Sequence, residues 1–201
     1  MDRAFPGDLL GYLARRYLLM KPRTAGFSLI ELMIVVTLIA ILVIASMPAV
    51  SDMLQNSRTR SVADSLQNGI RFAQTESARM SRLTTLATTA TNWTVSYTKI
   101  AGGSDSLPTL LQSSPSGNVG SVVITPDDAT HTALQFNDLG RVKVASTSAG
   151  PFTTLNADMY FTVNNSKGPR SLRVYVSPSG KVRMCDPDKS LAAGYPDGCP
   201  P

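Results

Sequence analysis

The chain has 201 residues, of which 43% are hydrophobic and 16% charged, and its formal net charge is +5. The first 26 residues carry five basic and two acidic side chains, so the remaining 175 residues carry only +2. Such a weak charge gives no bulk signature of a nucleic-acid-binding protein. The sequence shows no glycine-rich phosphate loop, nucleophile elbow or nameable carboxylate pair, and therefore predicts a protein that is not an enzyme and uses no cofactor or metal.

An apolar run near the N-terminus dominates the sequence. Its 21 residues, from Phe27 to Met47, contain one charged residue, Glu31. A helix rising about 1.5 Å per residue would cross the roughly 30 Å hydrocarbon core of a bilayer over this length. A carboxylate deep in that core costs about 2.5–3.5 kcal/mol, so we expect Glu31 to have a function. Four basic residues precede the run: Arg15, Arg16, Lys21 and Arg23. Because basic flanks stay on the cytoplasmic side, the C-terminal part of the chain is expected across the membrane.

Two simpler interpretations of the run are an ordinary secretory signal peptide and a glutamate without a special role. Ala45-Ser46-Met47 weakly matches a small-residue cleavage site, but the run is too long for a signal peptide and contains a glutamate. Glu31 lies near one end of the run, from which its carboxylate could also reach the membrane surface.

The start of the run resembles the class III signal of type IV pilins and pseudopilins, and reads Ala25-Gly26-Phe27-Ser28-Leu29-Ile30-Glu31-Leu32. In that family a membrane peptidase cuts after the glycine on the cytoplasmic side, and the new N-terminus is methylated. The resemblance implies cleavage between Gly26 and Phe27 and methylation of Phe27. It also implies that Glu31 pairs with the N-terminal amine of a neighbouring subunit, and that Pro48 kinks the helix. A glycine fits the cleavage position because it lets a peptidase approach the backbone closely.

The same resemblance implies an α+β, pilin-like fold, in which a long N-terminal helix packs on an antiparallel β-sheet domain. The expected parts are a leader (1–26), a transmembrane and filament-core helix (27–48), an amphipathic helix (49–82) and a β-rich domain with a bridged tail (83–201). Translation could begin at Met1 or at Met20. Expected partners are other pilins, the prepilin peptidase and methyltransferase, and the bacterial inner membrane. The C-terminal domain would be periplasmic before the chain enters a pilus or pseudopilus.

Local patterns predict the elements of the soluble part. Val62, Leu66, Ile70 and Ala73 recur at helical spacing, which predicts a helix that ends near 79–82 and packs on a sheet. Alternating apolar residues predict the strands 83–87, 93–98, 121–125, 132–136, 141–145 and 159–163. A loop is expected at 102–117 and a turn at 138–140. The clearest hairpin joins 170–177 to 181–185 through 178–180, and we expect an irregular tail over 186–201.

Cys185 and Cys199 lie close together in the sequence, in a part of the chain that the topology places outside the cytoplasmic membrane. Disulfides persist there, so we expect a bridge. Closing a loop of this length would contribute about 3 kcal/mol. Free thiols or a metal site are the alternatives, but no histidine or further cysteine lies near enough to complete a zinc site. The single histidine, His131, is expected to be structural.

Two C-terminal segments, 134–141 and 176–187, resemble the GspH/FimT/FimU branch of the pilin superfamily. That branch supplies minor pilins and minor pseudopilins, which sit at or near the filament tip and help to prime assembly. The resemblance therefore implies a minor pilin or pseudopilin function. The alternatives are a DNA-binding minor pilin for natural transformation and a GspH-type pseudopilin of type II secretion.

The DNA-binding alternative depends on a basic hairpin. Gly180-Lys181-Val182-Arg183 resembles the tail motif of DNA-binding FimT members, except that a lysine without the bidentate fork replaces the first arginine. Lys181 and Arg183 would share a strand face, and phosphate contacts there would weaken steeply with salt. The competing interpretation is a charged face that prevents edge pairing of the sheet. The candidate DNA-binding residues are Arg170, Arg173, Lys181 and Arg183.

Overall fold

The computed structural model describes residues 26–98, 109–114 and 121–200, so most of the expected leader (1–26) lies outside the described residues. The chain divides into two compact units, Met1–Met47 and Pro48–Pro201. One helix, α2 (Leu29–Met80), contributes to both units, and Pro48 lies inside it. The predicted kink at Pro48 stays a prediction.

In the first unit, none of the described residues packs against the side chains of α2. Phe27 is 83% exposed and Leu42 is 68% exposed, and every residue from Gly26 to Met47 is exposed. Among the described residues, α2 is the one helix long and apolar enough to cross a membrane. Thr37 and Ser46 donate their hydroxyl hydrogens to helix carbonyls one turn earlier, which satisfies these polar groups within the helix itself. This segment is therefore suited to a hydrocarbon environment.

In the second unit the rest of α2 buries one narrow face. Leu66, Ile70 and Ala73 are fully buried, as their spacing predicted, whereas Val62 is half-buried and its neighbour Ala63 takes the core position. The helix ends where Ser81 adopts a left-handed conformation with φ of 48°. Before that end, the hydroxyl of Ser77 donates to the carbonyl of Asn137, 2.9 Å away, and fixes the last helical turn to a turn of the β-structure.

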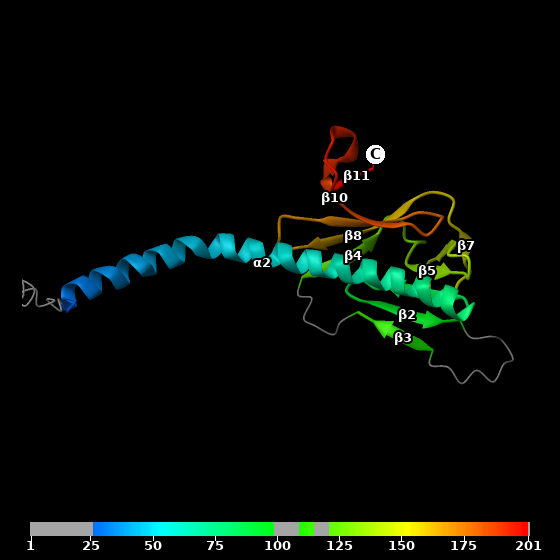
Figure 1. Ribbon diagram of the computed structural model, residues 1–201, viewed down its shortest axis with the longest axis horizontal. Helices are drawn as coiled ribbons and strands as arrows, with labels where there is room; N and C mark the ends of the chain where they lie inside the picture. The colour runs from blue at the N-terminus through cyan, green and yellow to red at the C-terminus, as the bar shows by residue number, and fades with distance from the viewer. Residues whose placement is uncertain (1–25, 99–108, 115–120, 201) are drawn as a thin grey trace, which may run out of the picture. The chain divides into compact units, whose positions relative to one another are not determined.

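Two β-sheets form the rest of this unit (Figure 1). In the first, all neighbouring strands are antiparallel. Its order is β3 (Leu110–Ser113), β2 (Trp93–Tyr97), β1 (Thr84–Thr88), β5 (Ala133–Phe136), β6 (Val142–Ala145) and β7 (Thr153–Thr154).

The second sheet is antiparallel except for one parallel pair, β10 with β11. Its order is β11 (Gly198–Cys199), β10 (Val182–Ser190), β9 (Leu172–Val176), β8 (Met159–Asn165) and β4 (Val122–Pro126). The expected α+β fold with a long helix on antiparallel β-structure is present, and it uses two sheets where one was expected.

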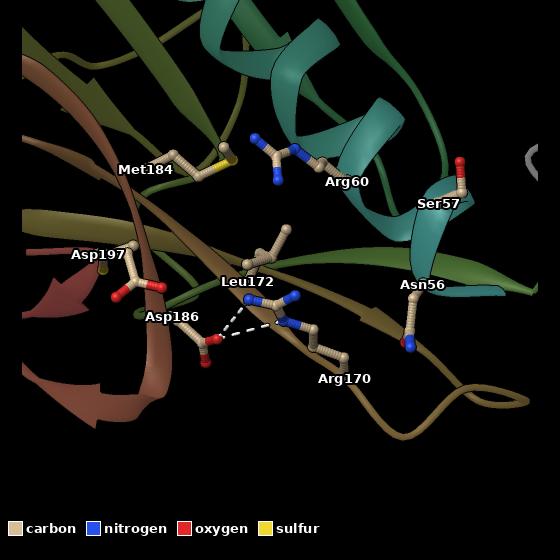
Figure 2. A pocket seen from close by; sticks show the side chains of 9 residues that line it. Asn56, Ser57, Arg60, Arg170, Leu172, Met184, Asp186 and Asp197 are labelled. Atoms are coloured by element: carbon tan, nitrogen blue, oxygen red, sulfur yellow. Dashed lines mark hydrogen bonds and ion pairs between the residues drawn. The ribbon is translucent and has the colours of Figure 1, made fainter. Parts of the chain in front are cut away.

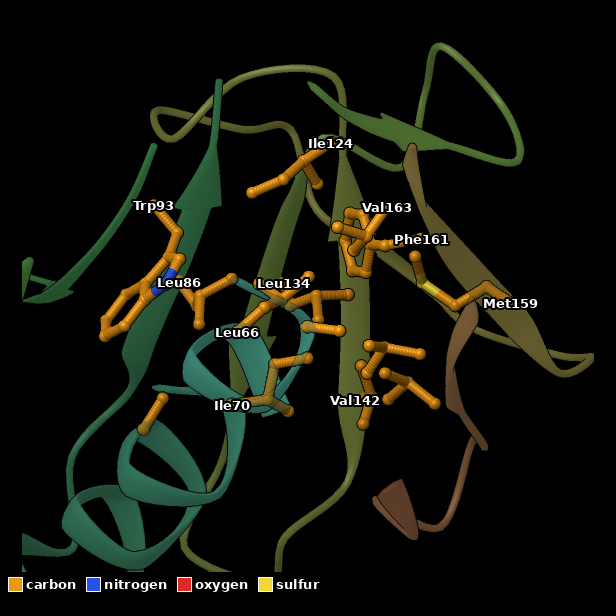
Figure 3. Packing of buried hydrophobic residues seen from close by; sticks show 14 of the residues in the cluster. Leu66, Ile70, Leu86, Trp93, Ile124, Leu134, Val142, Met159, Phe161 and Val163 are labelled. Atoms are coloured by element: carbon orange, nitrogen blue, oxygen red, sulfur yellow. The ribbon is translucent and has the colours of Figure 1, made fainter. Parts of the chain in front are cut away.

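A single hydrophobic core joins α2 to both sheets (Figure 3). Leu66 and Ile70 come from the helix, Leu134 from the first sheet and Phe161 from the second, and all four side chains are fully buried. Burying one such side chain stabilises the folded state by about 1.5–3 kcal/mol. The amphipathic part of the helix and the strands therefore form one cooperative unit.

Two sequence-based expectations were wrong. The expected loop 102–117 contains the strand β3, which pairs with β2; the glycines, prolines and serines around Leu110 and Leu111 obscured that short strand. The tail, expected to be irregular, continues β10 as far as Ser190 and then forms the 3₁₀ helix η1 (Leu191–Ala193) and β11. Pro187 is accommodated because the pairing of β10 with β11 shifts register between Asp186 and Ser190.

Candidate functional site

The N-terminal candidate site comprises Gly26, Phe27 and Glu31. A Cβ added to Gly26 would meet no atom within 4 Å, so nothing in the described chain requires a glycine there. Glu31 lies in the first turn of α2, where the helix dipole favours a carboxylate. In the described part of the chain no side chain pairs with Glu31.

The C-terminal disulfide lies at the other end of the chain. Cys185 and Cys199 are joined by an S–S bond of 2.07 Å, with their Cα atoms 5.0 Å apart, so the expected bridge is present. It links the middle of β10 to the short strand β11 and closes the C-terminal loop, which we define as residues 186–198. Both cysteines are buried.

Three charged interactions hold this C-terminal loop. The guanidinium of Arg170 donates to the buried carboxylate of Asp186 from Nε and Nη2, at 3.2 and 2.6 Å. Lys189 donates to Asp197, and this hydrogen bond lowers the pKa of the Asp197 carboxyl below its usual value. Arg183 donates to two loop carbonyls, those of Pro196 and Gly198. The loop is therefore fixed by side chains as well as by the disulfide.

The four candidate DNA-binding residues are brought onto or beside one hairpin, but three of them have partners within the domain. Arg170 and Arg183 bind the C-terminal loop as described above. Arg173 lies 4.6 Å from the ring centroid of Tyr160, in a cation–π contact. Lys181 is exposed at the turn of the hairpin. In the antiparallel pairing of β9 with β10, Arg173 lies opposite Cys185 and Arg183 lies opposite Tyr175.

His131 also has a structural partner. Its Nδ1 lies 2.7 Å from a carboxylate oxygen of Asp127, four residues earlier in a tight turn. In the same turn, the backbone N–H and hydroxyl of Thr130 donate to Asp128 and lower the pKa of that carboxyl. Within the described residues, no three histidine, cysteine or acidic side chains gather as a metal site.

A cleft that sequence reasoning missed lies between α2 and the strands β9 and β10 (Figure 2). Its volume is about 330 Å³. The sequence singled out Arg170 only as a candidate DNA-binding residue and gave no reason to pair it with Arg60. No local pattern could join them because they lie 110 positions apart in the chain. The lining residues are Asn56, Ser57, Arg60, Arg170, Leu172, Met184, Cys185, Asp186 and Asp197.

Two protein families match separate parts of the chain. The prokaryotic N-terminal methylation motif matches residues 21–47, and the family of type II transport protein GspH matches residues 62–180. No curated protein sequence matches the chain.

Two crystal structures of the type IV minor pilin FimU from Pseudomonas aeruginosa are similar to the chain. The structure in space group P21 is 14% identical with a TM-score of 0.48, and the match covers 68% of this chain and 95% of FimU. The structure in space group P65 is 15% identical with a TM-score of 0.45, and the match covers 65% of this chain and 94% of FimU.

A membrane-spanning helix behind a prepilin methylation motif, continued by a helix packed on β-sheets, defines a minor pilin or pseudopilin. The chain belongs to the GspH family, whose model matches more than half of its length. Its N-terminal helix anchors it in the inner membrane with the C-terminal domain in the periplasm. Its motif makes it a substrate of the prepilin peptidase and an assembly partner of other pilins.

Proposed function

We propose that the peptidase cuts this chain between Gly26 and Phe27, that Phe27 is then methylated, and that the mature protein enters a filament at or near its tip and helps to prime assembly. The role is structural, not catalytic. One observation carries the proposal: Glu31 is the single charged residue in an apolar, exposed helical segment. It lies four residues after Phe27, the new N-terminus.

The proposed role of Glu31 follows from the cost of charges in an apolar environment. Cleavage creates an ammonium group on Phe27, beside a segment that would pack among other apolar helices. An unpaired charge in such surroundings is strongly unfavourable, whereas a hydrogen-bonded pair offsets much of that cost. A neighbour's N-terminal ammonium is the partner that assembly itself would supply to Glu31.

The experiment compares Glu31→Gln with wild type in cells. The variant keeps the side-chain shape and removes the charge, so we expect normal membrane levels and normal cleavage but no variant in sheared filaments. Thr37→Val is the matched control because the hydroxyl of Thr37 bonds only to its own helix; this variant should enter filaments. Equal recovery of Glu31→Gln and wild type from sheared filaments would contradict the role of Glu31.

The type II secretion pseudopilus is a second candidate for the machine, favoured by the name of the matching family, type II transport protein GspH. Deleting the gene and measuring both surface pili and protein secretion separates the two machines. Loss of secretion with normal piliation would assign the chain to the secretion pseudopilus, and the opposite result would assign it to the pilus.

DNA binding through Arg170, Arg173, Lys181 and Arg183 stays a hypothesis that the local contacts do not favour. A guanidinium that already donates to a carboxylate or to backbone carbonyls must give up those bonds before it can contact a phosphate. Of the four, Lys181 alone is an exposed cation at the turn without a side-chain partner among the described residues. We therefore base the proposed function on assembly.

A further inference from the structure

A pocket of about 390 Å³ lies on the face of the first sheet that is turned away from the hydrophobic core. Val142 and Val144 on β6 point into the core and are buried, so Lys143 between them and Arg141 before them point outward together. Two positions on a strand span about 6.6 Å, which brings both cationic side chains to one pocket. The other lining residues are Leu83, Gln135, Asn137, Val142 and Thr154.

These two cations have no acidic partner in the described part of the chain. Neither Arg141 nor Lys143 forms an ion pair or a side-chain hydrogen bond with a described residue. Of the described residues that line the pocket, none is an aspartate or a glutamate. Asp138, in the turn between β5 and β6, is exposed and does not line the pocket, and Arg82 before β1 has an interaction of its own. As far as the chain is described, the pocket therefore holds two positive charges without a counter-charge.

The neutral side chains of the pocket add hydrogen-bond donors. In the sheet, Gln135 on β5 and Thr154 on β7 lie opposite Lys143, one on each side. The hydroxyl-bearing residue Thr154 is exposed. The side-chain oxygen of Asn137 accepts the backbone N–H of Arg141 at 2.7 Å, which leaves its NH₂ group as a donor for a ligand. Such a lining is suited to a ligand that accepts several hydrogen bonds at once.

We propose that this pocket binds a phosphate monoester in its doubly charged form. A guanidinium fork can donate to two oxygens of a phosphate, and an ammonium group can donate to a third. Two unmatched cations favour a monoester, which carries nearly two negative charges at pH 7, over a carboxylate or a phosphodiester, which carries one. Leu83 is 42% exposed and lines the pocket, where it would contact the organic group. The inference does not rest on the proposed function.

The first experiment titrates the full chain, in micelles of a detergent without phosphate, and follows its NMR signals. Propyl phosphate should produce saturable shifts of the backbone amides of Lys143 and Thr154. Dipropyl phosphate has one charge and should bind at least about tenfold more weakly. Inorganic phosphate lacks the organic group and should bind at least about threefold more weakly.

Each of these ligands can contradict the proposal. No saturable shift with propyl phosphate would overturn the site itself. A diester that binds as tightly as the monoester would overturn the selection of two charges. Inorganic phosphate that binds as tightly as the monoester would overturn the contact of the organic group with Leu83.

The second experiment assigns the binding to the two cations. Arg141→Gln and Lys143→Gln should each bind propyl phosphate at least about tenfold more weakly, because each loses a charged hydrogen bond. Lys143→Arg keeps the charge and should bind within about threefold of wild type. Lys167→Gln is the control, since Lys167 is exposed in the loop between β8 and β9 and does not line the pocket. Thermal unfolding shows which variants remain folded, and a folded Lys143→Gln that binds like wild type would overturn the assignment.

The third experiment uses the charge of the ligand itself. A monoester takes up its second proton near pH 6, so its affinity should fall about tenfold between pH 7.5 and pH 5. Sulfate keeps two charges over this range and controls for titrating groups of the protein, among them Asp138 and the pair of His131 with Asp127 that precedes β5. The affinity for sulfate should change by less than about twofold. An equal loss for both ligands would overturn the selection of the doubly charged monoester.

Discussion

The indole of Trp93 on β2 lies directly over Gly69 of α2, so that a Cβ at Gly69 would be 2.8 Å from ring atoms Cη2 and Cζ3. The ring nitrogen of Trp93 donates to the hydroxyl of Ser65, one turn earlier in the helix, at 3.3 Å. The absence of a side chain at position 69 therefore sets how closely the helix approaches the first sheet.

We expect Gly69→Ala to destabilise the domain. Alanine improves helix propensity by about 1 kcal/mol, but its methyl group would overlap a rigid aromatic ring in a packed core, which costs about 1–3 kcal/mol. Thermal unfolding of the full chain in micelles measures the balance, with Asn68→Ala as the control at an exposed neighbouring position. A Gly69→Ala protein more stable than wild type would show that the ring can move aside.

Replacing a second glycine, Gly180, should destabilise the domain by more than its backbone conformation alone explains. Gly180 has φ of 83°, and a Cβ there would collide with the side chain of Gln74 and the carbonyl of Gly140. Gly194 has nearly the same φ, 85°, but nothing within 4 Å of an added Cβ. Gly194→Ala should therefore cost about 1–2 kcal/mol for the left-handed backbone, and Gly180→Ala should cost about 1–3 kcal/mol more for the clash. Equal losses in thermal unfolding would show that the hairpin turn yields without strain.

The C-terminal loop should loosen in acid. The hydrogen bond from Lys189 lowers the pKa of Asp197 in the folded state, so its contribution to stability is present above the unfolded pKa and is lost as the pH falls through the folded pKa. We expect amide hydrogen exchange in the loop to rise, after correction for intrinsic rates, once the pH falls below about 4. Asp197→Asn should remove this part of the pH dependence, and Asp188→Asn, at an exposed position, should retain it. An unchanged acid response in Asp197→Asn would assign the effect to another group.

Sequence patterns predicted the parts of this fold that depend on neighbouring residues. Strict alternation in Trp93, Val95 and Tyr97 predicted β2, and the turn around Gly180 predicted the hairpin of β9 and β10. The face of α2 followed from the spacing of Leu66, Ile70 and Ala73. In each case the burial pattern repeats over a few residues, so a short window contains the whole signal.

The parts that were missed depend on residues far apart in the chain. The C-terminal loop is held in place by the hydrogen bonds from Arg170 to Asp186 and from Arg183 to two loop carbonyls. Amino-acid composition alone predicts neither set of bonds. The division into two sheets reflects pairings such as β4 with β8, about 37 residues apart. The cleft likewise needs α2, β9 and β10 to be placed together before Arg60 can be seen beside Arg170.

Mass spectrometry of the N-terminal peptide of the protein from membranes tests the central claim most directly. If the chain is a processed pilin-type subunit, its N-terminal residue is Phe27 with one added methyl group, and Gly26→Trp accumulates as the uncut precursor. A mature N-terminus at Pro48, as an ordinary signal peptidase would leave, would contradict this account, as would a wild-type chain that keeps residues 1–26.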